Sequence, residues 1–268
     1  MSKMRLRRYD NVIPNDIRDK VSLRYKKITK VINREFWNSE SEISNSIFVG
    51  SYGRNTAIST SDIDILAVLP SAEFDRYNSL SGNAQSRFLQ SVRKAIKVTY
   101  PNSDIRADGQ IVKVNFSDGI QFEVLPAFKQ WDGSYIYPNS NMGGNWLSTN
   151  PEAEQNAIRE KNSSSNGLLV ATCRHMRYIR DHYFKSYTLS GIVIDSFVYH
   201  AIGGWHFTKQ GEEKSASSMI YEEVLLNYYN DNSFNLQWGG LKAPGSYDDV
   251  SVAKSYECLG KVLRLMAE

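Results

Sequence analysis

The chain has little cysteine, with two residues among 268, and Cys173 and Cys258 lie far apart. Two cysteines so widely separated exclude a four-cysteine zinc site and argue against a disulfide-stapled secreted fold. This usage favours a reducing compartment, so we expect a cytoplasmic protein. The net charge is also small, at +3. A mild basic excess permits an anionic ligand such as a nucleotide but does not require duplex nucleic acid.

Long hydrophobic runs are absent as well. No stretch approaches the ~18 apolar residues that a membrane-spanning helix requires, and no apolar segment follows the basic residues 1–8, so we expect neither a membrane span nor a signal peptide. The sequence shows no internal repeat and no low-complexity tract. Apolar residues make up an ordinary 41% of the chain. A chain of this length forms one large domain or two modest lobes.

Hydrophobic periodicity divides the chain into two parts, with strand-like alternation before about residue 128 and helical spacing after residue 150. The pattern predicts strands at residues 47–49, 62–69, 111–116 and 120–125, the last two joined as a hairpin by Ser-Asp-Gly. It predicts helices at residues 14–38, 83–99, 151–162, 168–183, 189–202, 216–229 and 249–267. Residues 129–150 are rich in Gly, Asn and Ser and are expected to form a long loop. These elements predict an α+β fold with a sheet-containing domain over residues 1–150 and a helical lobe over residues 151–268.

A Gly-Ser turn followed by two aspartates is the most informative feature of the sequence. Gly50 and Ser51 could offer backbone N–H groups and a hydroxyl to phosphate oxygens. Asp62 and Asp64 are separated by one residue at the head of an apolar strand, so alternation sends both carboxylates to the same face. Neighbouring carboxylates repel each other, and a site that keeps both ionised usually holds a divalent cation. The segment therefore predicts a metal–nucleotide site for phosphoryl or nucleotidyl transfer.

A third acid is expected on a neighbouring strand, because two-metal catalysis clamps both the attacking and the leaving oxygen. Glu123 is the best candidate, since it alternates with apolar neighbours in Ile-Gln-Phe-Glu-Val. The alternative is that Glu123 lies on the solvent face of an edge strand. Three rival acids, Asp104, Asp108 and Asp118, sit beside turn residues, where aspartate more often caps or turns the chain.

These residues resemble the nucleotidyltransferases of the polymerase-β type. The resemblance is carried by Gly50-Ser51, by Ser61-Asp-Ile-Asp64 and by Phe122-Glu-Val-Leu-Pro-Ala-Phe128. More narrowly, the chain resembles the bacterial second-messenger synthases called CD-NTases, relatives of cyclic GMP-AMP synthase and oligoadenylate synthase, and within them the SMODS branch. Further matching segments are residues 82–86, 108–110, 143–146, 149–151 and 244–246. The resemblance extends over nearly the whole chain.

The resemblance implies a polymerase-β-like palm, a mixed β-sheet with helices, packed on a helical lobe and binding NTP in a cleft. It implies that Gly50 and Ser51 contact the triphosphate, and that Asp62, Asp64 and Glu123 bind Mg²⁺, or Mn²⁺ in its place. The family often has aspartate where this chain has Glu123.

The resemblance also matches Arg177 and Ser190 to two phosphate-contacting positions of the second lobe, the first of which is commonly lysine. An arginine there would grip phosphate bidentately. The alternatives are a solvated helix face for Arg177 and a turn or N-cap serine for Ser190. Tyr187 could stack a base and Lys185 could reach a phosphate, although both are also compatible with an ordinary solvated surface.

The expected function is Mg²⁺-dependent polymerisation of NTPs into a signalling nucleotide, cyclic or linear, by a monomer or small homo-oligomer. By resemblance, the product would act on an effector protein in bacterial antiphage defence. Three alternatives remain open: nucleotide transfer to a macromolecule such as tRNA or protein, linear homopolymer synthesis, and non-catalytic NTP binding by a regulator.

Overall fold

The computed structural model describes residues 4–6, 12–209, 211, 219–246 and 248–268. Its contacts divide the chain into two compact units. The helical unit comprises Met1–Val12, Arg54–Thr60 and Glu152–Glu268 in their described residues, and the sheet unit comprises Ile13–Gly53 and Ser61–Pro151. The later boundary lies next to the expected one at residue 150, and the helical unit also takes in two earlier segments.

The sheet unit contains a mixed seven-stranded sheet and three α-helices of more than one turn, in the part that the structure describes. Its elements are α1 (Asn15–Trp37), β1 (Ser46–Phe48), α2 (Gly50–Gly53), β2 (Ile63–Val68), α3 (Ser71–Asn78), α4 (Ala84–Thr99), β3 (Asp104–Asp108), β4 (Ile111–Asn115), β5 (Gln121–Lys129), β6 (Tyr135–Asn139), η1 (Asn141–Gly143) and β7 (Asn145–Thr149). The strand order is β1-β2-β5-β4-β3, and β6 pairs with both β5 and β7. The β2–β5 pair is parallel and its neighbours are antiparallel.

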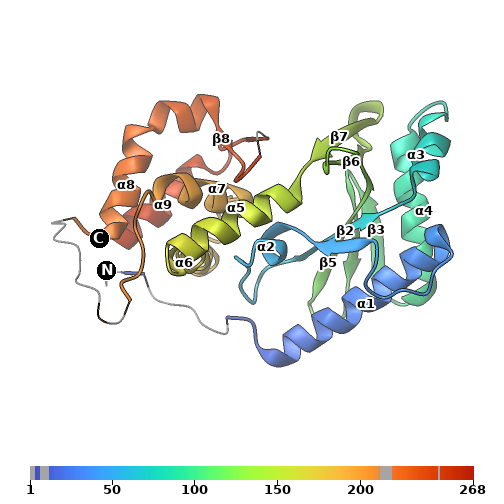
Figure 1. Cartoon of the computed structure of the whole chain (residues 1–268), viewed down its shortest axis with the longest axis horizontal. Coiled ribbons are helices and arrows are strands. Elements are labelled where there is room, and N and C mark those ends of the chain that lie inside the picture. Colours follow the sequence, from blue (N-terminus) through green and yellow to red (C-terminus); the bar gives the residue numbers. More distant parts are fainter. Residues whose placement is uncertain (1–3, 7–11, 210, 212–218, 247) are drawn as a thin grey trace. The chain divides into compact units, whose positions relative to one another are not determined.

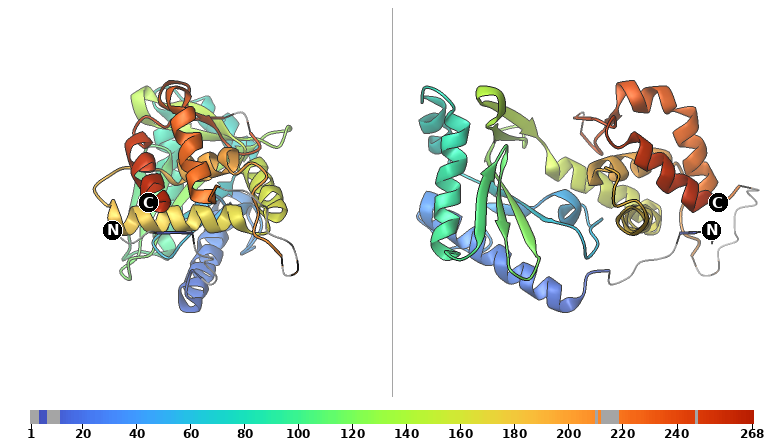
Figure 2. Two further views of the ribbon diagram at one scale, coloured as in Figure 1. Left: turned by 90° about the vertical axis from the view of Figure 1, so that its left-hand side faces the viewer. Right: turned by 180° about the vertical axis from the view of Figure 1, so that it is seen from behind.

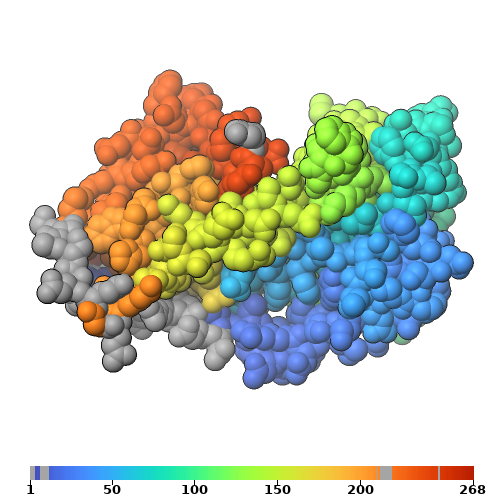
Figure 3. Space-filling view, viewed as in Figure 1, coloured from blue at the N-terminus to red at the C-terminus, as the bar shows by residue number. Residues whose placement is uncertain are grey.

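Alternation along the strands places an apolar set on the face covered by α1 and α4. Ile63 and Ile65 of β2 and Phe122 of β5 are buried in one cluster with Ile28 of α1 and Phe88 of α4. Figures 1 and 2 show these two helices lying along the same face of the sheet. The strand residues that alternate with this apolar set therefore point to the opposite face of the sheet. The helix α3 buries only Tyr77, and its outer surface is visible in Figure 3.

Residues 129–150 are not the long loop that the composition predicts. They contain the β6–β7 hairpin, in which Pro138 pairs with Trp146. The Trp146 ring packs against Phe74, Phe88 and Phe128, with centroid distances of 5.1, 5.9 and 5.7 Å. Packing of this partly buried ring against the aromatic cluster stabilises a hairpin whose sequence is dominated by turn-forming residues. The strand β3 and the helix α3 were also not among the expected elements.

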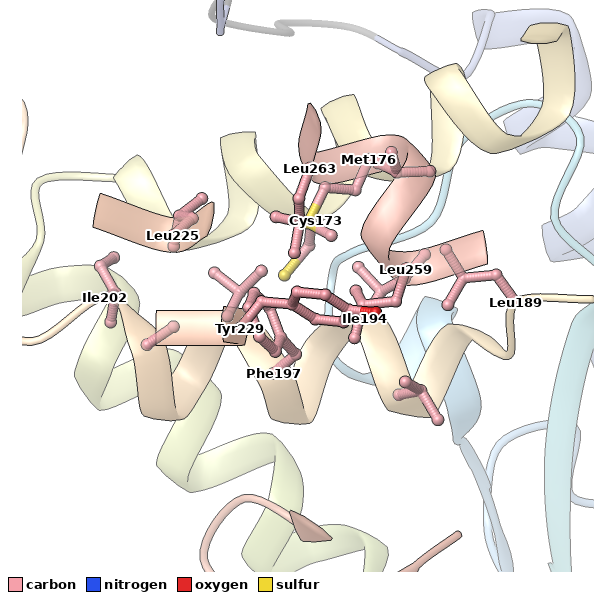
Figure 4. Packing of buried hydrophobic residues seen from close by; sticks show 14 of the residues in the cluster. Cys173, Met176, Leu189, Ile194, Phe197, Ile202, Leu225, Tyr229, Leu259 and Leu263 are labelled. Carbon is pink, nitrogen blue, oxygen red and sulfur yellow. The ribbon is translucent and has the colours of Figure 1, made fainter. Parts of the chain in front are cut away.

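The helical unit packs its helices around a separate apolar core. Its elements are α5 (Pro151–Ser164), α6 (Leu168–Tyr183), α7 (Gly191–Ala201), α8 (Tyr221–Asp231), η2 (Asn235–Gly239), β8 (Leu241–Lys242), β9 (Asp249–Val250) and α9 (Tyr256–Ala267). Figure 4 shows Cys173 and Met176 of α6, Phe197 of α7, Tyr229 of α8 and Leu259 of α9 converging in that core.

Two expected helices of this unit differ in their bounds. The structure shows the short strand β9 before α9, where one helix over residues 249–267 is expected. The helix expected at residues 216–229 is described from Tyr221, and residues 216–218 lie outside the described residues. Across the described ranges, no helix combines the length and apolar character needed to cross a bilayer.

Candidate functional site

The Gly-Ser turn lies directly against Asp64. The Val49 N–H donates to the Asp64 carbonyl oxygen at 2.9 Å, which fastens the end of β1 to β2 at this residue. Gly50 follows with φ at +58°, in the left-handed region. A Cβ added to Gly50 would lie 2.6 Å from the Asp64 Cγ atom and would collide with the carboxylate. Only glycine therefore allows this backbone to pass the carboxylate, and Ser51 comes next in the single turn α2.

Four charged residues form a row across the face of the sheet opposite the apolar set. Asp64 of β2 is paired in register with Glu123 of β5, Glu123 with Lys113 of β4, and Lys113 with Arg106 of β3. Residues paired in this way lie side by side on the same face. Asp62 precedes β2 by one residue and is exposed, so it is not part of the strand as expected, although its charge acts on Lys113. The charged row thus brings two of the three predicted acids to adjacent positions.

Glu123 already has cationic and amide partners. The Lys113 Nζ lies 3.3 Å from Glu123 Oε1 and 3.8 Å from Asp108 Oδ2. The Gln121 side-chain amide donates to the same Glu123 oxygen at 3.2 Å. The attraction of Glu123 is the main cause of a raised pKa at Lys113, so this ammonium stays charged at neutral pH. Because the Lys113 side chain is 34% exposed, the pair is only modestly stabilising.

The chemistry of the acids suits a magnesium site, since Mg²⁺ prefers carboxylate oxygens. Asp64 and Glu123 lie on adjacent strands in register, and Asp62 is two residues away on the chain. Within the described ranges, however, no three His, Cys, Asp or Glu side chains are gathered closely enough to hold a metal ion. Asp64 and Glu123 fit such a site by chemistry and by strand position, and Asp62, which lies outside β2, fits by chemistry alone. In this structure the Oε1 atom of Glu123 is held by Lys113 and Gln121.

The sequence suggested either a phosphate contact or a solvated helix face for Arg177, and the structure shows neither. Its side chain is 1% exposed, and its guanidinium donates to both Asp195 carboxylate oxygens at 2.6 and 2.8 Å. It also donates to the carbonyl oxygens of Cys173 and Gly191. Arg177 is therefore neither on a solvated helix face nor presented to a phosphate in this structure. A phosphate contact would require these buried bonds to break, so we leave Arg177 out of the phosphate site proposed below.

Asp195 joins Arg177 to a second buried arginine. Arg54 donates through Nε to Asp195 at 2.8 Å and through Nη1 to Glu154 at 2.7 Å. The Thr56 hydroxyl donates to Asp195 at 2.9 Å. We call Arg54, Glu154, Arg177 and Asp195 the buried ionic network. The sequence does contain a signal for this network, because Asp195 lies within the otherwise apolar run Ile-Val-Ile-Asp-Ser-Phe-Val of α7. None of the predicted site motifs includes this aspartate.

Ser190 lies at the start of α7 beside a polar cavity of the helical unit. It occupies the N-cap position of α7, in line with the N-cap alternative, but its side chain is exposed and makes no capping hydrogen bond. The preceding residue, Leu189, lines a cavity of about 390 Å³. The other lining residues are Thr60, Arg180, Asp181, Lys185 and Tyr187. Its lining combines the basic Arg180 and Lys185 with the acidic Asp181 and the aromatic Tyr187, and Arg180 is already paired with Asp181 at 2.6 Å.

Lys113 is the site residue that the sequence analysis missed. The predicted hairpin indicates this residue, because Lys113 and Glu123 are the same number of residues before and after Asp118 in the turn. A two-stranded pairing centred on that turn sets the lysine opposite the predicted third acid.

Comparison with known proteins identifies a family. The model of the family described as Second Messenger Oligonucleotide or Dinucleotide Synthetase domain (SMODS) matches residues 6–162. A probable cyclic nucleotide synthase from Bacillus cereus (strain VD146) is 21% identical over 195 residues, which cover 65% of this chain and 58% of that protein. The chain thus spans less than two thirds of the length of this curated relative.

Solved structures share the fold at low sequence identity. The CdnE cyclic dinucleotide synthase of Elizabethkingia meningoseptica, solved with GTP and Apcpp, has a TM-score of 0.61 at 14% identity, covering 96% of this chain and 91% of that one. The DncV cyclic AMP-GMP synthase of Vibrio cholerae has a TM-score of 0.56 at 13% identity, covering 82% and 61% of the two chains. These similarities confirm the predicted fold class, a mixed sheet with helices of the nucleotidyltransferase type.

Proposed function

The chain belongs to the SMODS family, and we propose that it is a Mg²⁺-dependent nucleotidyltransferase that polymerises NTPs into a cyclic or linear signalling nucleotide. One observation carries the site assignment: Asp64 is paired in register with Glu123 while the Gly50 backbone passes against the Asp64 carboxylate. A phosphate-binding turn and two acids on adjacent strands are the parts that nucleotidyl transfer requires.

In this proposal the chain's own residues bind and orient two nucleotides. The Gly50 and Ser51 backbone N–H groups and the Ser51 hydroxyl bind the triphosphate. Asp62 and Asp64 hold the cation that accompanies the triphosphate, and Glu123 completes the site next to the acceptor hydroxyl. Mg²⁺ bound there would neutralise the leaving pyrophosphate and lower the pKa of the acceptor hydroxyl. The remaining contribution is orientation of that hydroxyl in line with the α-phosphorus.

The family and the nucleotides bound in structures that share the fold support NTPs as the proposed substrates. The Elizabethkingia meningoseptica protein was solved with GTP and Apcpp, and the CdnC of E. coli MS115-1 with ATP. The CdnE of Rhodothermus marinus was solved with Apcpp and Upnpp, so we propose NTPs as the substrates, with all four ribonucleotides to be tested. In the helical unit, Ser190 and the nearby cavity side chains Lys185 and Tyr187 are proposed to contact the phosphates and a base. The product is proposed to act on an effector protein in antiphage defence, as the family resemblance implies.

Replacement of Asp64 by asparagine tests the proposal. Asp64→Asn keeps the shape of the side chain but removes the charge that a cation requires, so we expect product formation to fall by at least about a hundredfold. Asp75→Asn, on the exposed surface of α3 in the same unit, is the matched control and should leave the rate unchanged. The measurement is pyrophosphate release from each NTP with Mg²⁺ or with EDTA, followed by mass spectrometry of the products.

The same experiment separates the alternatives. Wild-type turnover that persists in Asp64→Asn would refute the assignment of the acids. Label that appears in a macromolecule instead of a small product would indicate transfer to tRNA or protein. NTP binding that is independent of Mg²⁺, with no pyrophosphate released, would indicate a regulator.

A further inference from the structure

The Gly-Ser turn has little in its own backbone to hold it in shape. It forms the single turn α2, which has glycine at two of its four positions, and all four residues are only partly buried. Glycine loses much conformational freedom on folding, and a single helical turn fixes several dihedral angles for few hydrogen bonds. The Gly53 N–H donates to the Val49 carbonyl at 2.9 Å, which closes the turn. The shape of the turn therefore depends on what its side chains pack against.

Tyr52 is the large side chain of this turn, and its ring belongs to an aromatic stack that reaches α1. The ring centroid of Tyr52 lies 6.0 Å from that of Phe48 in β1, and the Phe48 centroid lies 4.3 Å from that of Tyr25 in α1. The planes of the two pairs differ by 28° and 23°, so both contacts are stacked. Aromatic pairs stabilise a structure by more than the area they bury. We call Tyr25, Phe48 and Tyr52 the aromatic stack.

Hydroxyl groups fix the α1 end of the aromatic stack. The Tyr25 hydroxyl donates to the Ser46 carbonyl at 2.8 Å and accepts from the Ser46 hydroxyl at 2.8 Å. The Thr29 and Ser46 hydroxyls are buried and lie 2.7 Å apart. Breaking hydrogen bonds between buried groups is costly, because the groups lose their partners without gaining water. These bonds fasten two successive turns of α1 to β1, which ends two residues before Gly50.

The protonation state of Tyr52 leaves ring packing as its contribution to the turn. Burial raises the pKa of Tyr52, and the positive charge of Arg18 in α1 only partly offsets that rise. The phenol therefore stays neutral at physiological pH. A neutral phenol places no charge beside the phosphate-binding turn and does not act as a base.

We propose that Tyr52 is a positioning residue whose ring, through the aromatic stack, holds the Gly-Ser turn in the shape that binds a triphosphate. This inference rests on the proposed function, because it takes the N–H groups of Gly50 and Ser51 as phosphate donors. Ser51 directly precedes Tyr52, so the ring restricts the backbone that carries the Ser51 hydroxyl and N–H. A turn that its ligand must first order binds that ligand more weakly, since the ordering opposes binding.

The affinity of the full-length protein for Apcpp with Mg²⁺, measured by isothermal titration calorimetry, tests this proposal. Apcpp is the ATP analogue with which two structures that share the fold were solved, and its α,β-methylene bridge prevents pyrophosphate release. Tyr52→Ala removes the ring, and we expect it to weaken binding by about three- to tenfold, the effect of losing one aromatic pair. Tyr52→Phe keeps the ring and should restore the wild-type affinity.

Tyr100→Ala is the matched control. Tyr100 is also partly buried against the core of the sheet unit, and its ring centroid lies 5.0 Å from that of Phe116. The ring lies outside the aromatic stack, so its removal should lower the stability of the fold and leave the affinity for Apcpp unchanged. Urea unfolding measures the stability of each variant.

Steady-state kinetics with the four NTPs separate positioning from a simple loss of folded protein. Weaker binding of the triphosphate in the ground state and the transition state alike raises KM and leaves kcat unchanged. A smaller folded fraction lowers the apparent kcat and leaves KM unchanged. We therefore expect Tyr52→Ala to raise KM for the NTPs with little change in kcat.

Weaker Apcpp binding and a higher KM in Tyr52→Ala alone support the proposal. Wild-type affinity in Tyr52→Ala overturns it, as does an equal loss in Tyr100→Ala or in Tyr52→Phe, because a general weakening of the core or the hydroxyl would then explain the effect. If Asp64→Asn keeps wild-type turnover while Tyr52→Ala still binds Apcpp weakly, the assignment of the acids fails and the role of Tyr52 stands. A wild-type protein that binds neither Apcpp nor any of the four NTPs overturns both.

Discussion

Gly50 has no room for a side chain, because its backbone passes against the Asp64 carboxylate. Gly50→Ala would place a methyl group 2.6 Å from the Asp64 Cγ atom and would also force alanine into a left-handed conformation. We expect the carboxylate to be displaced and pyrophosphate release from NTPs to fall by at least tenfold, by analogy with about 10²-fold losses from misplaced catalytic groups. Steady-state kinetics at saturating Mg²⁺ measure the change.

Gly119 supplies a control for the backbone conformation alone. It also has a positive φ, at +85°, but a Cβ there meets nothing within 4 Å. Gly119→Ala should therefore lose only about 1–2 kcal/mol of stability from the left-handed conformation and keep its activity. Equal loss of activity in both variants would show that strain, and not contact with Asp64, explains the effect.

Side-chain alternation along the strands predicted the positions of Asp64 and Glu123 but not that of Asp62, which lies outside β2. Asp64 and Glu123 are indeed neighbours on adjacent strands, although their role as metal ligands stays a prediction. Arg177 could not be placed in this way. An arginine on a helix is usually solvated, and its burial follows from a partner, Asp195, which lies on a different helix.

At the scale of elements, Asp195 joins α7 to α6 and to the segment that carries Arg54. Its carboxylate is fully buried and accepts four hydrogen bonds from Arg54, Thr56 and Arg177. Removing one partner from a buried ion pair leaves uncompensated charge, so Asp195→Asn should lower the free energy of unfolding by about 3–5 kcal/mol. Asp249→Asn breaks an exposed pair with Lys242 and should cost less than about 1 kcal/mol. Urea unfolding at neutral pH measures both.

The loss in Asp195→Asn should also depend on pH. Burial alone would raise the pKa of Asp195, but Arg177 and Arg54 more than offset it and lower that pKa to about 2. A depressed pKa stabilises the folded state above the unfolded value near 3.9, and this stability is lost as pH falls through the folded value. The difference between wild type and Asp195→Asn should therefore shrink by about 2 kcal/mol from pH 5 to pH 2. A difference that stays constant over that range would contradict the ionic role.

Several helices were predictable because their apolar spacing is regular and their ends carry clear signals. Pro151 at the first position of α5, with acids in its first turn, is one such signal. The β6–β7 hairpin was missed because its residues favour turns by composition. It forms because Trp146 is packed among aromatic rings from α3, α4 and β5, a tertiary contact that no local pattern contains.

At the scale of the whole molecule, the chain does not divide at a single point. The helical unit includes Arg54–Thr60, a segment that lies in sequence between the Gly-Ser turn and β2. The described N-terminal residues of the chain also belong to the helical unit. The Leu6 N–H donates to Glu222 at 2.8 Å, and the Met4 carbonyl contacts His175 Nε2 at 2.7 Å. A linear boundary near residue 150 could not include these segments, because membership in a core depends on contacts between residues distant in sequence.

This interleaving predicts that the C-terminal segment does not fold independently as it does in the whole chain. A fragment of residues 152–268 lacks Arg54, so Glu154 loses its 2.7 Å partner and Asp195 retains only one of two arginines. Exposed polar and apolar surface left by the missing segments adds to that loss, and we expect a lower and broader thermal transition than in the full chain.

Arg54→Met in the full chain is the control, because it measures how much stability is lost when only the buried ionic network is broken. It should destabilise the protein less than truncation does, because the other contacts of residues 54–60 are kept. Circular dichroism and calorimetry compare the three proteins. A fragment that melts as sharply and at the same temperature as the full chain would mean that residues 152–268 carry their own complete core.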